Sequence, residues 1–293
     1  MTNQTFLFDR RTFLAACAAL VPMNALAKRV SKLKYAFTSY EWGKEWDLPT
    51  LIANCAKAQA FGVELRTDEH HKHGVELSLN EAQRRAVKQR FRDSPVRLLT
   101  INCGERFDSP DAAVRKAAVE KAQEYVLLAR DTGAAGIRVF PNDLHKEVPE
   151  AETIAGIAES LNALGRYAQD YGQIIRLENH GSAGRLTTLR KVMDRVEQKN
   201  VRIKLNSDPK DNADGKFAEN FALVKDRLDD TLHMRPYRDT AFPYQLQFDL
   251  LIDMGWDGWC IVEESVQVPD PAQALIEEHQ IWQKMITQSL HRA

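Results

Sequence analysis

Short runs rich in Val, Ile and Leu alternate with longer helical patterns from Lys32 to the end of the chain. Alternation at this spacing is typical of a parallel sheet with crossover helices. Each run is brief and apolar, as expected for strands that are buried on both faces. The eight predicted strands are Leu33–Thr38, Gly62–Arg66, Val96–Asn102, Gly136–Phe140, Gln173–Glu178, Val201–Asn206, Thr231–His233 and Gly258–Glu263.

The segments between these runs carry apolar residues at helical spacing, as in Asp111–Arg130 and Ile154–Tyr171. Ser78-Leu79-Asn80-Glu81 has the form of a capping box for a helix that runs to about Phe91. Eight strand–helix units in about 260 residues favour a closed (β/α)₈ TIM barrel of the α/β class over a doubly wound sheet. The absence of a GxGxxG after the first strand points the same way. We expect a single catalytic domain over residues 31–293.

The first thirty residues have a different character. Asp9-Arg10-Arg11-Thr12-Phe13-Leu14 precedes an apolar run from Ala15 to Ala27, which ends in an Ala-x-Ala pattern. This resembles a twin-arginine signal peptide, which implies the twin-arginine export machinery as a partner, removal of the segment near Ala27 and a periplasmic mature protein. The run is too short to form a stable membrane anchor. A short amphipathic helix that caps the domain is the alternative.

Charge and cysteine content exclude several classes of protein. The chain has 40 Lys and Arg against 41 Asp and Glu, so it lacks the basic field of a nucleic-acid-binding protein. Its cysteines form no CxxC pair, which argues against a zinc knuckle or a disulfide scaffold. We expect Cys55, Cys103 and Cys260 to be small buried hydrophobic residues, whereas Cys17 would leave with the signal segment. A second copy of the chain, in a homo-oligomer, is a further candidate partner.

Polar residues at the carboxyl ends of barrel strands are the first candidates for chemistry, because the active site of such a barrel forms there. The fifth predicted strand ends in Glu178, Asp208 follows the sixth, and the seventh and eighth end in His233 and Glu263. Three carboxylates and one imidazole from four successive strands would suit Mn²⁺, Mg²⁺ or Zn²⁺. Carboxylates buried at the ends of apolar strands are costly without such a partner.

These four residues look like the metal tetrad of the xylose-isomerase-like barrels. That superfamily contains sugar isomerases, sugar phosphate isomerases/epimerases, ketose epimerases, inosose dehydratases and family 2 AP endonucleases. Phe61-Gly62-Val63-Glu64-Leu65-Arg66 resembles its second-strand pattern, and Met254-Gly255-Trp256-Asp257-Gly258-Trp259 resembles its approach to the eighth strand. The resemblance extends over nearly the whole mature chain and specifies the superfamily better than the substrate.

The sixth strand departs from the superfamily pattern. Most relatives place an acidic residue directly after the strand's Leu, where this chain has Asn206, and Asp208 comes two residues later. Since side chains alternate along a strand, either residue could reach the metal, and Asp208 is the predicted ligand because of its charge. No His follows Asp208 closely, so the three-zinc site of the AP endonucleases cannot be assembled from these positions.

Five further residues are predicted to bind substrate: Arg66, His73, Arg138, His180 and Arg235. Two of these assignments have alternatives. The polar segment 67–73 could fold over the pocket or be a solvated His-rich turn. Arg138 could instead form a structural ion pair with a barrel carboxylate.

The resemblance implies proton removal next to a carbonyl, with the divalent ion stabilising the resulting enediolate. Glu178 and Glu263 are the predicted catalytic residues, because they could exchange protons on the two faces of the substrate, as a sugar isomerase or epimerase requires. The same group of residues could drive elimination from a 3-keto-glycoside or a related keto sugar. A non-catalytic exported sugar-binding barrel is the third possibility, since fold does not guarantee function. The sequence contains no phosphate-cradling glycine loop, so residue patterns do not support a phosphorylated substrate.

Overall fold

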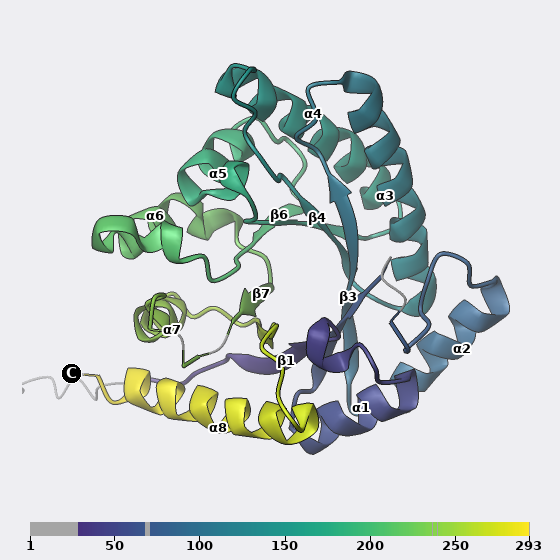
Figure 1. The fold of residues 1–293 in the computed structure, drawn as a ribbon, viewed down its shortest axis with the longest axis vertical. Coiled ribbons are helices and arrows are strands. Elements are labelled where there is room, and N and C mark those ends of the chain that lie inside the picture. Colours follow the sequence, from purple (N-terminus) through teal and green to yellow (C-terminus); the bar gives the residue numbers. More distant parts are fainter. Residues whose placement is uncertain (1–28, 68–70, 236, 239, 293) are drawn as a thin grey trace, which may run out of the picture. The chain divides into compact units, whose positions relative to one another are not determined.

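Eight parallel strands curl into a barrel, and eight helices form a ring outside it in the computed structural model (Figure 1). The structure describes residues 29–67, 71–235, 237–238 and 240–292, so the predicted signal segment lies almost entirely outside it. Residues 31–293 form one compact unit.

The strands are β1 Lys34–Thr38, β2 Gly62–Arg66, β3 Arg97–Arg106, β4 Gly136–Phe140, β5 Ile174–Glu178, β6 Val201–Lys204, β7 Thr231–Met234 and β8 Trp259–Val262. The helices are α1 Leu48–Lys57, α2 Glu81–Arg92, α3 Ala112–Thr132, α4 Glu150–Gln169, α5 Leu186–Met193, α6 Phe217–Val224, α7 Tyr244–Asp253 and α8 Pro271–Leu290. The predicted (β/α)₈ barrel is confirmed.

The backbone pairing that closes the barrel is regular between β1 and β8 and sparse between β6 and β7. Strands β1 and β8 pair over four residues, and α8 lies beside α1 outside them (Figure 1). Between β6 and β7 there is only one isolated parallel bridge, Ile203 to Leu228. Backbone hydrogen bonds from Asp229 N to Ile203 O (2.8 Å) and from His233 N to Leu205 O (2.7 Å) complete this seam.

Local sequence signals set the helix boundaries. The α2 helix begins after Asn80, whose side chain accepts from Gln83 N while the Gln83 side chain accepts from Asn80 N. The capping box therefore spans residues 80–83, two residues later than the predicted box at Ser78. Gly133 ends α3 with a φ of 89°, a left-handed backbone conformation that a side chain would disfavour.

The sixth strand ends at Lys204, two residues before the predicted end. Beyond it the chain leaves the strand and enters a 3₁₀ helix, η3 (Pro209–Gly215), whose N-cap is Asp208. The alternation that would have pointed Asn206 and Asp208 the same way therefore does not apply.

Charged groups fill part of the barrel interior. Arg176 of β5 is buried near the amino ends of the strands and pairs with Asp229 (2.6 Å) and Asp230 (2.9 Å). Glu64 of β2 and Lys204 of β6 are both fully buried and pair across the barrel at 2.5 Å. Buried charges of this kind persist only when they are paired, so the lumen is cross-linked by ion pairs.

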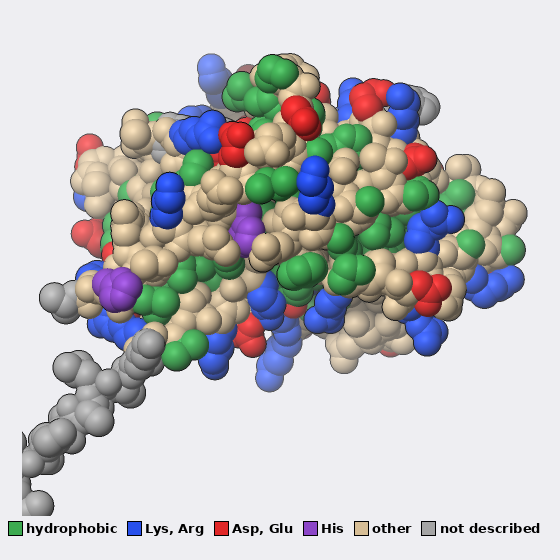
Figure 2. Space-filling view, turned by 90° about the horizontal axis from the view of Figure 1, so that it is seen from below, with side chains coloured by type: hydrophobic (Ala, Val, Ile, Leu, Met, Phe, Trp, Pro, Cys, Tyr) green, Lys and Arg blue, Asp and Glu red, His purple; other side chains and the backbone are tan. Residues whose placement is uncertain are grey.

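The outer surface shows no continuous basic region on the face that Figure 2 presents, where Lys and Arg are dispersed among acidic and apolar side chains of the described residues. None of the described helices is long and apolar enough to cross a membrane. Cys55, Cys103 and Cys260 are buried free thiols, as predicted. Burial raises the pKa of the Cys260 thiol to about 12, so this group stays protonated.

Candidate metal centre and active site

Glu178, His233 and Glu263 meet at the carboxyl ends of the strands. Glu178 is the last residue of β5, His233 belongs to β7 and Glu263 directly follows β8. One donor atom from each lies within 4.8 Å of the other two. The Nδ1 atom of His233 is 3.3 Å from Glu178 Oε2 and 3.5 Å from Glu263 Oε1. These are three of the four residues that the sequence pattern predicts as metal ligands.

The His233 ring is held from behind by Glu64. Its Nε2 atom lies 2.6 Å from Glu64 Oε2, and both side chains are fully buried. Glu64 Oε1 accepts from Lys204 Nζ, and Glu64 Oε2 accepts from Asn102 Nδ2 at 3.1 Å. A carboxylate that binds one ring nitrogen of a histidine and leaves the other free is the usual support for a metal-ligating imidazole.

Arg138 supports Glu178 in a similar way. Its Nε atom lies 3.1 Å from Glu178 Oε2, and its guanidinium stacks on Phe140 at 3.9 Å and donates to Cys103 O at 3.0 Å. Arg138 is 1% exposed and is not among the residues that line the pocket. The structure thus contradicts its prediction as a substrate ligand and supports the alternative, a structural ion pair with a barrel carboxylate.

The sixth-strand position of the cluster is occupied by Asn206 and not by Asp208. Asn206 Nδ2 donates to Glu178 Oε1 at 2.8 Å and to Glu263 Oε2 at 3.2 Å. Asp208 accepts from Lys210 N at 2.9 Å as the cap of η3 and is absent from the group of converging donors. Asp208 has turned away because β6 ends at Lys204.

The electrostatics of the cluster are dominated by the three carboxylates around His233. Burial and Lys204 disfavour the imidazolium, yet Glu263, Glu178 and Glu64 outweigh them and raise the pKa of His233 to about 9. For Glu178, burial opposes ionisation, but His233 and Arg138 lower its pKa well below the usual range. The centre therefore holds ionised carboxylates that attract positive charge.

A polar cavity of about 190 Å³ opens directly onto this cluster. Glu178, Asn206 and Glu263 form its floor. Its walls include the predicted substrate residues Arg66, His180 and Arg235 together with Tyr40, Phe140 and Ser265. The Arg66 guanidinium lies over the Tyr40 ring at 5.2 Å, and the His180 ring packs against Phe140 at 4.5 Å.

His73 does not line this cavity, contrary to the prediction. It is 6% exposed, its Nε2 lies 2.9 Å from Arg66 O, and its Nδ1 accepts from Val75 N. Burial, together with the nearby His71, lowers the pKa of His73 to about 4, so the ring is neutral. This histidine fixes the chain after β2 and positions Arg66. Residues 68–70 of the same segment lie outside the described part of the chain.

The donor atoms of the cluster fit a bound divalent cation. Glu178 Oε2, His233 Nδ1 and Asn206 Oδ1 are all buried and have no hydrogen-bond partner among the described residues. Buried polar atoms rarely lack a hydrogen bond, and within the described part of the chain Glu178 Oε2 and His233 Nδ1 have only the ion-pair contacts with Arg138, Glu263 and each other. A bound cation would supply the missing partner. Carboxylate oxygens, an imidazole nitrogen and an amide oxygen match the preferences of Mn²⁺, Mg²⁺ and Zn²⁺.

Sequence reasoning missed the roles of Glu64 and Lys204. The sequence pattern places Glu64 in the second strand without a role at the metal and does not single out Lys204. Both sit at inward positions of otherwise apolar strands, Gly62-Val63-Glu64-Leu65 and Val201-Arg202-Ile203-Lys204. The signal that could have revealed this pair is one acidic and one basic residue in two strands predicted to be buried. A buried charge requires a partner of opposite charge.

Comparisons with known proteins identify the family and the fold. Residues 52–285 match the family model described as xylose isomerase-like TIM barrel. Among solved structures, a D-tagatose 3-epimerase-like protein has a TM-score of 0.70 at 18% identity, covering 88% of this chain and 99% of that one. The 3-keto-D-glucoside 4-epimerase from E. coli has a TM-score of 0.67 at 14% identity, with coverages of 87% and 99%.

A third similar structure is the IolI protein with a bound zinc atom, at a TM-score of 0.67, 15% identity and coverages of 88% and 98%. No curated protein sequence matches. At these identities the structural likeness shows the fold, whereas the family match covers most of the sequence. The chain belongs to the xylose isomerase-like TIM barrel family.

Proposed function

We propose that this protein is a divalent-metal-dependent sugar isomerase or epimerase that removes a proton next to a carbonyl. One observation carries the proposal: donor atoms of Glu178, His233 and Glu263 converge at the carboxyl ends of the strands, and Glu178 and Glu263 line a polar cavity. Glu178 Oε2 and His233 Nδ1 are buried and have no hydrogen-bond partner among the described residues. The similarity to an epimerase-like protein, a keto-glucoside epimerase and a zinc-binding protein supports both the metal and the substrate class.

Glu178, Asn206, His233 and Glu263 would hold the ion, and the Asn206 amide would turn its oxygen toward it. The bound ion would polarise the carbonyl of the substrate as a Lewis acid. Glu178 and Glu263 both reach the cavity floor, so one takes the proton from the carbon next to the carbonyl and the other returns a proton. Arg138 keeps Glu178 in place during this exchange.

The cavity walls favour a polyhydroxylated substrate. Arg66, His180 and Arg235 present nitrogen donors around the space above the cluster, and sugar hydroxyls and carbonyls accept such hydrogen bonds. Phe140 supplies one apolar face. We propose Arg66, His180 and Arg235 as the substrate-binding residues.

A lyase acting on a 3-keto-glycoside is the second candidate, favoured by the similarity to a 3-keto-D-glucoside epimerase. Here the proton would leave next to the carbonyl and an alkoxide would depart from the β-carbon. His180 lines the cavity, and its Nδ1 is buried with no partner among the described residues, so it is placed to protonate that leaving group.

The deciding experiment combines metal analysis with proton exchange. Purified protein, stripped with a chelator and reloaded with Mn²⁺, is incubated with a panel of keto sugars in deuterated water and followed by NMR. We expect stoichiometric metal and exchange of the α-proton, slowed by about 10² to 10⁴-fold in Glu178→Gln and in Glu263→Gln. The exposed Glu159→Gln serves as the control. Wild-type exchange rates in both metal-loaded variants would refute the two-carboxylate mechanism, and a protein without metal would favour a sugar-binding barrel.

We further propose that the protein is exported by the twin-arginine route and is periplasmic, from the Arg10-Arg11 pair and the Ala25-x-Ala27 pattern. Mass spectrometry of periplasmic protein should find a terminus near Lys28. Export that survives replacement of both arginines by lysine would contradict the route.

A further inference from the structure

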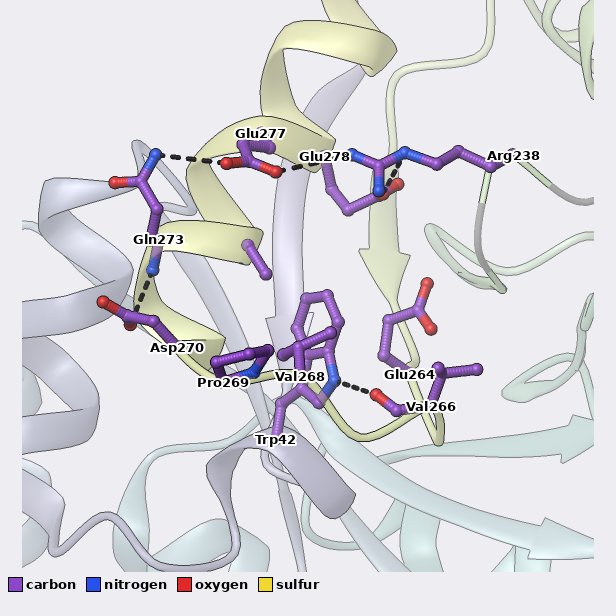
Figure 3. Close-up of a pocket in the computed structure, with 11 residues that line it drawn as sticks. Trp42, Arg238, Glu264, Val266, Val268, Pro269, Asp270, Gln273, Glu277 and Glu278 are labelled. Atoms are coloured by element: carbon purple, nitrogen blue, oxygen red, sulfur yellow. Dashed lines mark hydrogen bonds and ion pairs between the residues drawn. The ribbon is translucent and has the colours of Figure 1, made fainter.

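A second cavity, of about 400 Å³, is drawn in Figure 3. None of Glu178, Asn206, His233 and Glu263 lines it. It is enclosed by the 3₁₀ helix η1 (Glu41–Gly43), the segment after β8 and the first turns of α8. Glu263 lines the metal-centre cavity, whereas the next residue, Glu264, lines this one. The chain after β8 thus separates two distinct spaces.

Glu264 is the unexplained group in this cavity. It is 3% exposed, its Oε1 atom is buried without a hydrogen-bond partner, and it forms no ion pair with any described residue. In Figure 3 its side chain lies beside the Trp42 ring and below Glu278 and Arg238, with no interaction drawn to it. A buried carboxyl group without a donor is costly, so a ligand that supplies the donor would be stabilised there.

The other charged groups of the cavity do not satisfy Glu264. Arg238 approaches Glu277 at 3.5 Å and Glu278 at 3.7 Å, and its side chain is 63% exposed. Glu278 is itself 3% exposed and has its Oε2 atom without a hydrogen-bond partner. One exposed guanidinium therefore approaches two acidic groups of α8, and Glu264 has no ion pair with a described residue.

The opposite wall is aromatic and aliphatic. Trp42 is 6% exposed, and its indole Nε1 donates to Val266 O at 2.7 Å, which fixes the ring against the cavity. Val268 and Pro269 extend this wall (Figure 3). An indole face near a carboxyl group suits an organic cation, whereas Mg²⁺ or Ca²⁺ would require several oxygen ligands.

We infer that this second cavity binds a small organic amine, whose ammonium group donates to Glu264 and Glu278 and whose apolar body lies against Trp42. The site is separate from the metal centre and does not depend on the proposed reaction. The amine is inferred because the buried Glu264 carboxyl group lacks a hydrogen-bond donor among the described residues and lies beside the Trp42 ring.

Benzylamine and its neutral counterpart benzyl alcohol test the inference on the full-length mature protein. The reporter is the indole N–H resonance of Trp42, identified by its loss in Trp42→Phe. We expect benzylamine to shift this resonance saturably, with binding by benzyl alcohol at least tenfold weaker. Glu264→Gln should weaken benzylamine binding by about tenfold or more, since it removes a charge-assisted hydrogen bond. Glu159→Gln, an exposed change elsewhere, should leave it unchanged.

Equal binding of the two probes, or equal benzylamine binding by wild type and Glu264→Gln, would overturn the inference. Glu278→Gln provides a second variant if Glu264→Gln does not fold. Glu178→Gln should bind benzylamine as wild type does, which separates this result from any failure of the proposed catalysis. Sedimentation equilibrium separates the two sources of an amine: a monomer that binds benzylamine supports a free ligand. A dimer that dissociates in Glu264→Gln would assign the amine to a lysine of a second copy and overturn the small-molecule assignment.

Discussion

Glu64 Oε2 lies 2.6 Å from His233 Nε2, and this contact turns Nδ1 of the same ring toward Glu178 and Glu263. The orientation of the imidazole is thus set by a strand on the far side of the barrel. Lys204 holds Glu64 in turn at 2.5 Å. The proposed metal centre therefore includes Glu64 and Lys204, which would not touch the ion.

Glu64→Gln should lower the affinity for Mn²⁺ or Zn²⁺ by about 10 to 100-fold, because the ring loses the partner that orients it and raises its basicity. The change also leaves Lys204 buried without its counter-charge, which would lower the free energy of unfolding. The double variant Glu64→Gln with Lys204→Met separates the effects: stability should recover while metal affinity stays low. Recovery of both would show that Glu64 acts only through stability.

The sixth-strand ligand can be identified with a matched pair of variants. Asn206→Ala should lower metal affinity by about tenfold or more, whereas Asp208→Asn should leave it unchanged, since Asn can also cap η3. Asn206→Asp should bind the ion more tightly because it adds a charge. Isothermal titration with Mn²⁺ measures all three, and a loss of affinity in Asp208→Asn would restore Asp208 as the ligand.

Asp229→Asn should destabilise the barrel by about 3 kcal/mol, because buried Arg176 loses its fully buried carboxylate partner and keeps only the half-exposed Asp230. Urea unfolding followed by circular dichroism gives the free energy of unfolding. Metal affinity should not change, because this pair lies near the amino ends of the strands, away from the cluster. A loss of metal affinity in folded Asp229→Asn would contradict the assignment of stability to the amino ends of the strands and of metal binding to their carboxyl ends.

The contribution of His73 to the stability of the barrel should fall as the pH drops from about 6.5 to about 4. The folded-state pKa of His73 is lowered to about 4, so between these values the unfolded chain binds a proton that the folded chain does not. The resulting slope is about 1.4 kcal/mol per pH unit at most, and stability is retained above the window. His73→Gln should remove this component, and an unchanged slope between pH 4 and 6.5 would rule it out.

The strand pattern of the sequence predicted the barrel and the residues at three of four strand ends. It did so because strands buried on both faces must be apolar and because their carboxyl ends share one rim. The fourth position was mispredicted because the end of β6 depends on the turn that begins η3, and periodicity does not locate such an end within two residues.

The errors at Arg138 and His73 have a common physical origin. Both are polar residues near strand ends, where a side chain can face the substrate or brace a neighbour. Arg138 braces Glu178 because its guanidinium is fully buried, and His73 accepts and donates within its own turn. Burial of an individual side chain depends on packing by distant segments, which residue spacing does not reveal.

The sparse backbone pairing between β6 and β7 has a consequence for how this enzyme can diversify. Lys204 of β6 and His233 of β7 lie on the two sides of that seam, and both bind Glu64. The Glu64 carboxylate therefore links the two strands and also orients the His233 ring. A substitution at Glu64 would weaken both the contact between β6 and β7 and the orientation of His233. Substitutions at the cavity-lining residues Tyr40, Arg66 and Arg235 would leave that contact intact. Laboratory evolution toward new sugars should therefore accumulate changes at the rim and keep Glu64 fixed.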